Sequence, residues 1–227
     1  MPEFTSEKAL VLSSRRFGER QWIVTLLTKE NGKISGVLKK KQSPETGAFV
    51  SVRWRARLSE QLGTLYLEES NPFSVGYLDD KKRLACLSSL CLLLNDTLPD
   101  RQAFPDLYQK TFLFLEKLDS DDFLKLYVLW EKELLTELGF GFDFTVCAGG
   151  GDASDLAYVS PKTGRAVSRE KGMPYQKLLL PLPAFFWKNS AADDGDVQDG
   201  LRLTGYFLSQ QTFHQKLPEI RARLMSI

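Results

Sequence analysis

The first 80 residues alternate between apolar and polar positions in short runs, a pattern typical of β-strands. The dipeptide Asn31-Gly32 separates two of these runs and can adopt the positive φ angles of a tight hairpin turn. Turn-forming residues recur roughly every ten positions, which favours a small β-barrel over a βαβ unit. The predicted strands are Ala9 to Leu12, Trp22 to Thr28, Lys33 to Leu38, Phe49 to Ser59 and Gly63 to Glu68.

After Lys81 the apolar residues recur at intervals of three and four, the period of an α-helix. Residues 140 to 195 have no regular period and are expected to be irregular. Helices are predicted from Lys81 to Leu98, from Pro105 to Leu118, from Ser120 to Gly139, from Val197 to His214 and after Pro218. The predicted fold class is therefore α+β. A β-barrel domain over residues 1 to 78 precedes an all-α helical domain over residues 79 to 227, which contains the irregular loop region.

Positive charge is concentrated in the first part of the chain. Residues 1 to 60 carry 12 Lys and Arg against 6 Asp and Glu, a balance of +6, whereas the remaining residues carry −5. The whole chain is nearly neutral at +1, although its N-terminal third is basic. A basic N-terminal segment is typical of a domain that binds a polyanion, but solvated lysines can also cluster by chance.

The predicted strand from Phe49 to Ser59 carries three arginines at alternate positions. Side chains alternate between the two faces of a strand, so these arginines share one face and lie about 7 Å apart. This separation is comparable with the spacing of phosphates along an extended nucleic-acid strand. Because like charges on one face repel each other, the arrangement favours an anionic partner. The arginines are Arg53, Arg55 and Arg57, and the opposite face carries Val52, Trp54, Ala56 and Leu58.

Further cations lie in the neighbouring turns, and the aromatic residues Phe17 and Trp22 occur among them. A basic surface with aromatic side chains is what sequence-independent binding of single-stranded nucleic acid requires. The alternative is an exposed face whose cations pair with carboxylates from elsewhere in the chain. The additional candidates for phosphate binding are Arg16, Arg20, Lys33, Lys39, Lys40 and Lys41.

Residues suited to catalysis or metal binding are sparse. His214 is the single histidine, and three cysteines cannot supply the four thiolates of a Cys-only zinc site. Gly149 to Gly151 is not followed by Gly-Lys-Ser/Thr, so the P-loop pattern fails. Asp119, Asp121 and Asp122 suit the start of a helix, although a metal-dependent nuclease that uses them stays an alternative. We therefore expect no enzymatic activity, no metal and no cofactor.

The sequence also bears on location. No apolar run is long enough for a transmembrane helix, and the first residues do not match a secretory signal. The odd number of cysteines forms no disulfide pattern, which favours a reducing compartment. We expect a cytoplasmic protein that does not bind a membrane.

Several stretches together resemble the RecO family of DNA repair proteins. The segment ALVLSSRRFGERQWIVTLLTKENGKISGVLKKK resembles the opening of that family, with an Arg-aromatic-Gly-Glu turn at Arg16 to Glu19. Trp130 to Gly151 resembles the family's helix-to-loop passage, in which a Leu-Gly-aromatic sequence precedes a cysteine. Leu156 to Ser168 also fits, and these pieces in order cover most of the chain.

The resemblance implies an oligonucleotide-binding barrel (OB-fold) and a recombination mediator that is not an enzyme. Such proteins bind single- and double-stranded DNA, anneal complementary strands and help to load RecA onto DNA coated with single-stranded DNA-binding protein (SSB). The implied partners are RecR, the acidic C-terminal tail of SSB and, in some cases, RecF, in a protein associated with the nucleoid. An RNA-binding OB-fold module is the remaining alternative.

The chain departs from the family at one place. Family members with zinc carry four cysteines, whereas here Cys147 stands alone at the first position and Gly150 replaces its CxxC partner. We expect the loop region to hold together without metal, through packing of Leu178 to Leu180 and Phe185 to Trp187.

Overall fold

The computed structural model describes residues 2–58, 61–72, 76–188, 190–213 and 216–225. Contacts divide the chain into two compact units, Met1–Phe112 and Leu113–Ile227. Helix α1 and most of α2 therefore group with the strands, while the domain boundary predicted at residues 78 and 79 stays a prediction.

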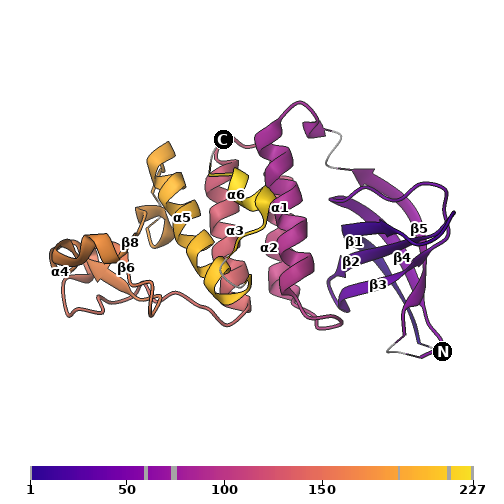
Figure 1. Ribbon diagram of the computed structural model, residues 1–227, viewed down its shortest axis with the longest axis horizontal. Helices are drawn as coiled ribbons and strands as arrows, with labels where there is room; N and C mark the ends of the chain where they lie inside the picture. The colour runs from indigo at the N-terminus through magenta and orange to yellow at the C-terminus, as the bar shows by residue number, and fades with distance from the viewer. Residues whose placement is uncertain (1, 59–60, 73–75, 189, 214–215, 226–227) are drawn as a thin grey trace. The chain divides into compact units, whose positions relative to one another are not determined.

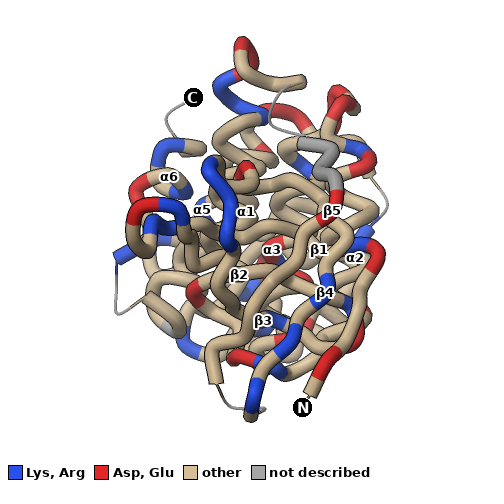
Figure 2. Tube along the Cα trace, turned by 90° about the vertical axis from the view of Figure 1, so that its right-hand side faces the viewer, with Lys and Arg blue, Asp and Glu red and all other residues tan. Residues whose placement is uncertain are grey.

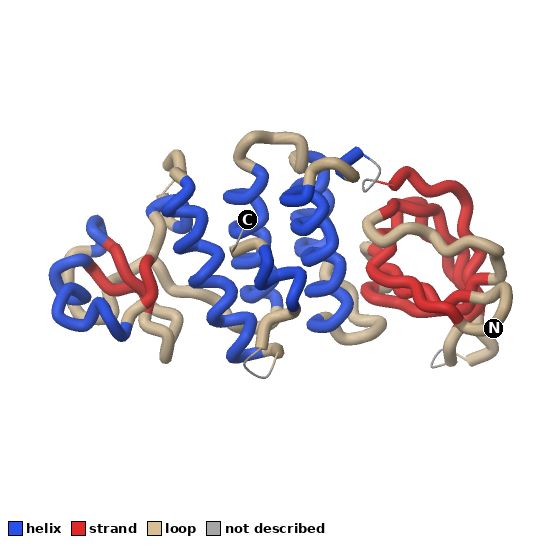
Figure 3. Tube along the Cα trace, turned by 45° about the horizontal axis from the view of Figure 1, so that its top comes forward, coloured by secondary structure: helices blue, strands red, loops and turns tan. Residues whose placement is uncertain are grey.

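Five strands of the first unit close into a barrel in the order β1-β2-β3-β5-β4 (Figures 1 and 3). Strands β3 and β5 pair in parallel, and the other neighbours pair antiparallel. A five-stranded barrel with this connection is an OB-fold, so the predicted barrel and its fold class are confirmed. The strands are β1 (Glu3–Arg16), β2 (Trp22–Thr28), β3 (Gly32–Leu38), β4 (Ala48–Arg55) and β5 (Gly63–Pro72).

The predicted strand bounds hold for β2 and differ elsewhere. Strand β1 is much longer than Ala9 to Leu12, because its first half pairs with β4 and its second half pairs with β2. Strand β4 ends at Arg55, and the predicted end at Ser59 lies outside the described residues. Leu58 was predicted to share a strand face with Val52, Trp54 and Ala56, but it lies in the bend after β4 and is 59% exposed, whereas those three residues are buried.

The barrel strands are buried on two faces. Val11 and Leu26 lie inside the barrel, whereas their neighbours Leu10 and Leu27 are 1% exposed without belonging to the interior cluster. Helix α1 (Lys81–Thr97) packs against β1, and its Asn95 side chain accepts a hydrogen bond from Ser13. The second apolar layer on β1 is therefore covered by α1.

The second unit is built around α3 (Phe123–Glu137) and α5 (Asp194–Gln211), which pack against each other, with α6 (Glu219–Arg223) after them. Helix α2 (Pro105–Glu116) spans the division between the units. The predicted helices are confirmed with shifts of a few residues at their ends. The predicted end of the α5 segment at His214 lies outside the described residues.

The expectation that residues 140 to 195 are only irregular is wrong. They contain a sheet in the order β7-β6-β8 and the short helix α4 (Arg169–Gly172). The sheet strands are too short to show a period in the sequence. They are β6 (Leu156–Val159), β7 (Ala166–Ser168) and β8 (Leu180–Pro181). Phe185 and Phe186 are buried as predicted, but 72% of Leu178 is exposed.

Within the described residues, every helix is too short or too polar to cross a bilayer.

Candidate nucleic-acid interface

Strand β4 presents its arginines to solvent, because Val52 and Trp54 take the alternate positions inside the barrel. The guanidinium of Arg53 lies over the ring of Tyr66 on β5, 4.9 Å from its centroid. Arg55 lies 4.0 Å from the carboxylate of Glu3, and both side chains are about half exposed. Arg57 is exposed in the bend after the strand. Figure 2, with Lys and Arg in blue, shows the basic stretch on β4.

The lysines after β3 lie along β5. Leu38 at the end of β3 pairs with Leu65, which pairs in turn with Trp54 of β4. The Lys40 ammonium accordingly donates a hydrogen bond of 3.0 Å to the Leu67 carbonyl. The segment Lys39–Lys41, which we call the lysine tract, therefore flanks β5 on one side, and Arg53 flanks it on the other. Two strand spacings separate them, about 10 Å.

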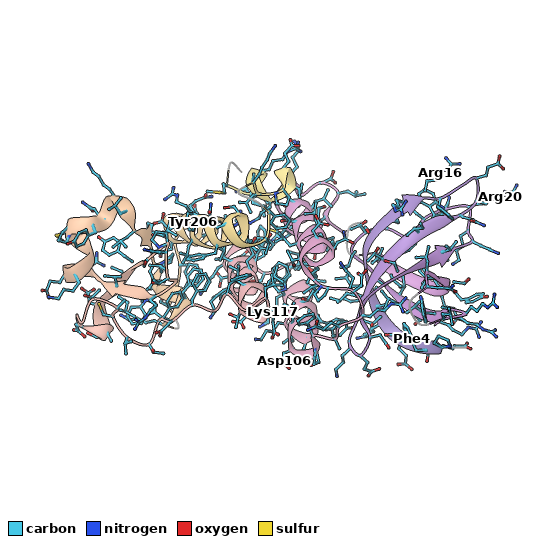
Figure 4. The ribbon with its side chains drawn as sticks, turned by 60° about the horizontal axis from the view of Figure 1, so that its bottom comes forward. Phe4, Arg16, Arg20, Asp106, Lys117 and Tyr206 are labelled. Carbon is cyan, nitrogen blue, oxygen red and sulfur yellow. The ribbon has the colours of Figure 1, made fainter. Side chains whose placement is uncertain are left out.

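Arg16 and Arg20 lie next to the lysine tract. Arg16 pairs with Trp22, and Trp22 pairs with Leu38, which directly precedes the tract. The Arg16 guanidinium donates to the carbonyls of Gly18 and Glu19, which fixes the turn between β1 and β2. Figure 4 shows Arg16 and Arg20 close together on the barrel. Positive charge from the lysine tract and from β4 thus flanks β5, and Arg16 lies further along the barrel, across β2 from the end of β3.

Lys33 does not join this group. Its ammonium donates to the carbonyl of Asn95 in α1 at 2.6 Å and lies 3.3 Å from Asp100. Only 13% of the Lys33 side chain is exposed. We therefore correct the sequence assignment and leave Lys33 out of the interface. The set kept, here called the basic face, is Arg16, Arg20, Lys39, Lys40, Lys41, Arg53, Arg55 and Arg57.

Two open hollows run along the basic face. One, of about 600 Å³, is lined by Thr5, Lys8, Arg53 and Tyr66, among others. The other, of about 590 Å³, is lined by residues that include Lys40, Pro44 and Leu67. Glu68 lines both hollows, so they meet on β5. The surface between the lysine tract and Arg53 is therefore concave, with a carboxylate where the hollows join.

Sequence reasoning missed two residues of this region. Tyr66 is 48% exposed and gives the basic face an aromatic surface, which its alternation on β5 could have indicated. Arg101 follows α1, and its guanidinium lies 5.1 Å from the centroid of the Trp54 ring. No signal in the sequence could place Arg101 on the barrel, because the path of the chain after α1 decides it.

Comparison with models of protein families shows to which family the chain belongs. The model described as "Recombination protein O N terminal" matches residues 1–71, and "Recombination protein O C terminal" matches residues 78–219. The chain belongs to the recombination protein O family. The resemblance to RecO seen in the sequence is thereby confirmed.

Full-length relatives agree with the family models. The DNA repair protein RecO of Rhodospirillum centenum is 43% identical over 97% of this chain and 92% of its own length. The DNA repair protein RecO of Caulobacter vibrioides strain NA1000 is 40% identical over 96% of this chain and 95% of its own. That of Cereibacter sphaeroides strain ATCC 17029 is 38% identical over 100% and 98%.

Cys147, the lone cysteine of the irregular loop region, is hydrogen-bonded by protein groups. The Cys147 sulfur accepts a hydrogen bond from the backbone N–H of Ser168 at 3.2 Å, and its thiol donates one to the Ser168 hydroxyl oxygen at 3.5 Å. Burial by itself raises the pKa of Cys147, but bonds from Ser168, Gly151 and Gly149 outweigh it and lower the pKa to about 7. Across the described residues, no group of three His, Cys, Asp or Glu could hold a metal ion.

Proposed function

We propose that this RecO-family chain binds single- and double-stranded DNA on the basic face and anneals complementary strands without making or breaking a covalent bond. The observation that carries the proposal is that the lysine tract and Arg53 flank β5 on its two sides, with Arg16 further along the barrel, across β2 from the end of β3. Cations from two segments far apart in sequence meet there, and the carboxylates of Glu68 and Glu3 offset only part of their charge, so the surface favours a further anion.

The proposed mechanism is electrostatic. Cations on the basic face neutralise phosphates of a bound strand and release its counterions, which supplies affinity without reading the base sequence. If two complementary strands bind the same surface, their mutual repulsion falls and base pairing becomes faster. Tyr66, backed by Arg53, offers bases an exposed ring in the middle of this surface.

Partners follow from the family resemblance. We propose that the chain acts with RecR, in some settings with RecF, binds the acidic tail of SSB and helps RecA to load on SSB-coated DNA in the cytoplasm. An acidic peptide with an apolar end needs an apolar pocket with a basic rim. Arg221 cannot serve as that rim, because it is fully buried against Glu131. Lys125, Lys132 and Arg223 stay candidates.

Annealing of complementary oligonucleotides coated with SSB tests the proposal. One strand carries a donor dye and the other an acceptor, so that energy transfer reports pairing. We expect the chain to accelerate annealing, and the triple variant of Arg53, Arg55 and Arg57 to Ala to lose most of that acceleration. Replacement of Arg165, Arg169 and Arg202 by Ala removes the same charge from the second unit and is the matched control.

Two results would contradict the proposal. One is an unchanged annealing rate in the presence of the wild-type chain, and the other is equal loss in both triple variants. Cleavage of labelled oligonucleotides with Mg²⁺ or Mn²⁺ that disappears in Asp121→Ala would instead support the nuclease alternative. Tighter binding of RNA than of DNA with the same sequence would support the RNA-binding alternative.

A further inference from the structure

A small cleft lies in the first unit, lined by residues at the interior side of β4, whose outer side carries Arg53 and Arg55. Its volume is about 240 Å³, and Phe4, Ile34, Trp54 and Arg101 contribute to its walls. The Phe4 and Trp54 rings are stacked, with centroids 5.3 Å apart and planes inclined by 19°. The Arg101 guanidinium lies over Trp54, so three flat groups meet at the cleft. Figure 4 shows Phe4 on the barrel, apart from Arg16 and Arg20.

Arg101 is held in place by an unusual backbone. Its φ angle is +62°, and it is the one described residue other than glycine with a positive φ. Its backbone N–H donates to the Lys33 carbonyl, and its guanidinium donates to the Gln61 carbonyl at 2.8 Å. A residue other than glycine is strained in this backbone conformation, and such strain is concentrated at ligand-binding positions. The strain here sets a guanidinium at the cleft while leaving the residue exposed.

The size and chemistry of the cleft indicate its ligand. It is smaller than the pockets of about 300–1,000 Å³ that enclose drug-sized molecules, so it suits a single flat ring. Aromatic rings and guanidinium groups are the surfaces on which nucleobases stack in single-stranded nucleic acid. Glu30 and Asn31 also line the cleft. Because these two residues are polar, the cleft is a poor site for an aliphatic side chain.

The neighbouring residues connect the cleft to the basic face. Trp54 stands between Arg53 and Arg55 on β4, and Phe4 pairs with Trp54 while Glu3 pairs with Arg55. Trp54 faces the barrel interior and Arg55 faces the outside, so a ring in the cleft leaves its sugar and phosphate at the end of β4, from which the backbone can pass around the Glu3–Arg55 pair to the basic face. We infer that the cleft takes one nucleobase of the DNA strand bound on the basic face, with Phe4 and Arg101 as its stacking surfaces. This inference rests on the proposed function and specifies where one base of the DNA strand on the basic face is bound.

The test compares binding of two single strands of equal length, one with normal bases and one with abasic sugars throughout. Phe4→Leu removes a stacking ring but keeps an apolar side chain. Arg101→Asn removes the guanidinium with a residue that tolerates positive φ. We expect each variant to lose roughly 5- to 100-fold in affinity for the normal strand. Affinity for the abasic strand stays unchanged in Phe4→Leu. Tyr175→Leu, which removes a 60% exposed ring from the second unit, binds both strands like the wild type.

A second measurement locates the contact. A strand that contains 5-iodouracil is irradiated on the wild-type chain, and the cross-linked peptide should contain Phe4 or Trp54. The inference is overturned if both variants bind the normal strand like the wild type and the cross-link falls elsewhere. Occupation of the cleft by an aromatic side chain of a protein partner would give that result. In that case the proposed function would still stand if the DNA affinity of the wild type falls steeply with salt concentration. If the wild-type affinity does not depend on salt, both the proposed function and the inference about the cleft are wrong.

Discussion

The ammonium of Lys33 donates to the backbone carbonyl of Asn95, 62 residues further along the chain, at 2.6 Å. Asn95 belongs to the last turn of α1, where carbonyl groups without a helical partner attract a cation. The contact fastens α1 to the barrel over the second apolar layer of β1. A lysine that the sequence groups with DNA-binding cations therefore has a role in stability.

Replacement of Lys33 by Met should lower the free energy of unfolding of the first unit by about 1.5–3 kcal/mol, the range for a hydrogen bond to a charged group. The salt dependence of oligonucleotide affinity should not change. Urea denaturation and binding titrations at several salt concentrations measure both quantities. Lys29→Met, at an exposed position on the same hairpin, is the control. A salt slope reduced by about 0.7 in Lys33→Met would return this residue to the interface.

The arginines of β4 should behave in the opposite way. If about six phosphates are engaged, the logarithm of affinity for a single strand falls against the logarithm of salt with a slope of roughly −4. Removal of Arg53, Arg55 and Arg57 together should reduce the slope to roughly −2, with little effect on stability, because these side chains are exposed. An unchanged slope in the triple variant would exclude these three arginines from phosphate binding.

A buried ion pair holds the second unit together. Arg221 of α6 contacts Glu131 of α3, and Thr204 of α5 donates to the same carboxylate at 2.6 Å. Neither Arg221 nor Glu131 has exposed surface, so Arg221→Met leaves a buried carboxylate without its cation. We expect a loss of about 3–5 kcal/mol in the unfolding free energy of this unit.

Two comparisons isolate the effect of this pair. The double variant Arg221→Met with Glu131→Leu should recover most of the loss, because no buried charge is left unpaired. Arg223→Ala breaks an exposed pair with Glu219 on the same helix and should cost less than about 1 kcal/mol. If Arg221→Met is as mild as Arg223→Ala, the pair does not stabilise the unit.

The Cys147 thiol should react at neutral pH. Its pKa is lowered from 9.0 to about 7, whereas burial raises the pKa of Cys91 to about 12. The rate of alkylation by iodoacetamide should therefore rise through a midpoint near pH 7 and disappear in Cys147→Ser. Mass spectrometry of the alkylated peptides distinguishes the two thiols. A midpoint near pH 9 would show that the Ser168 and glycine donors do not stabilise the thiolate.

The same pKa shift makes stability depend on pH. The folded-state pKa of Cys147 is depressed, so its contribution is fully present above about pH 9 and is lost as the pH falls through about 7. The difference in melting temperature between the wild type and Cys147→Ser should grow from pH 6 to pH 9. A constant difference over that range would contradict the lowered pKa.

Local rules were sufficient for much of this molecule. The period of two on β3 and β4, and the turn before Gly32, follow from side-chain alternation and from glycine at a φ of +63°. Asn31 does not share the positive φ that the Asn-Gly pair suggested. The small sheet β6–β8 was missed, because strands of two to four residues are shorter than any period that could reveal them.

The sequence by itself predicted a small β-barrel of four or five strands, the order of the helices that follow it, the family of the chain and the exposure of Arg53 and Arg55 on β4. Only the tertiary structure decided that Lys33 is covered while the lysine tract is exposed, and that Phe4, Trp54 and Arg101 meet at one cleft. The physical reason is the distance along the sequence over which each effect acts. Alternation along a strand is set by its own backbone, but the covering of a face depends on segments that return to it from far along the chain.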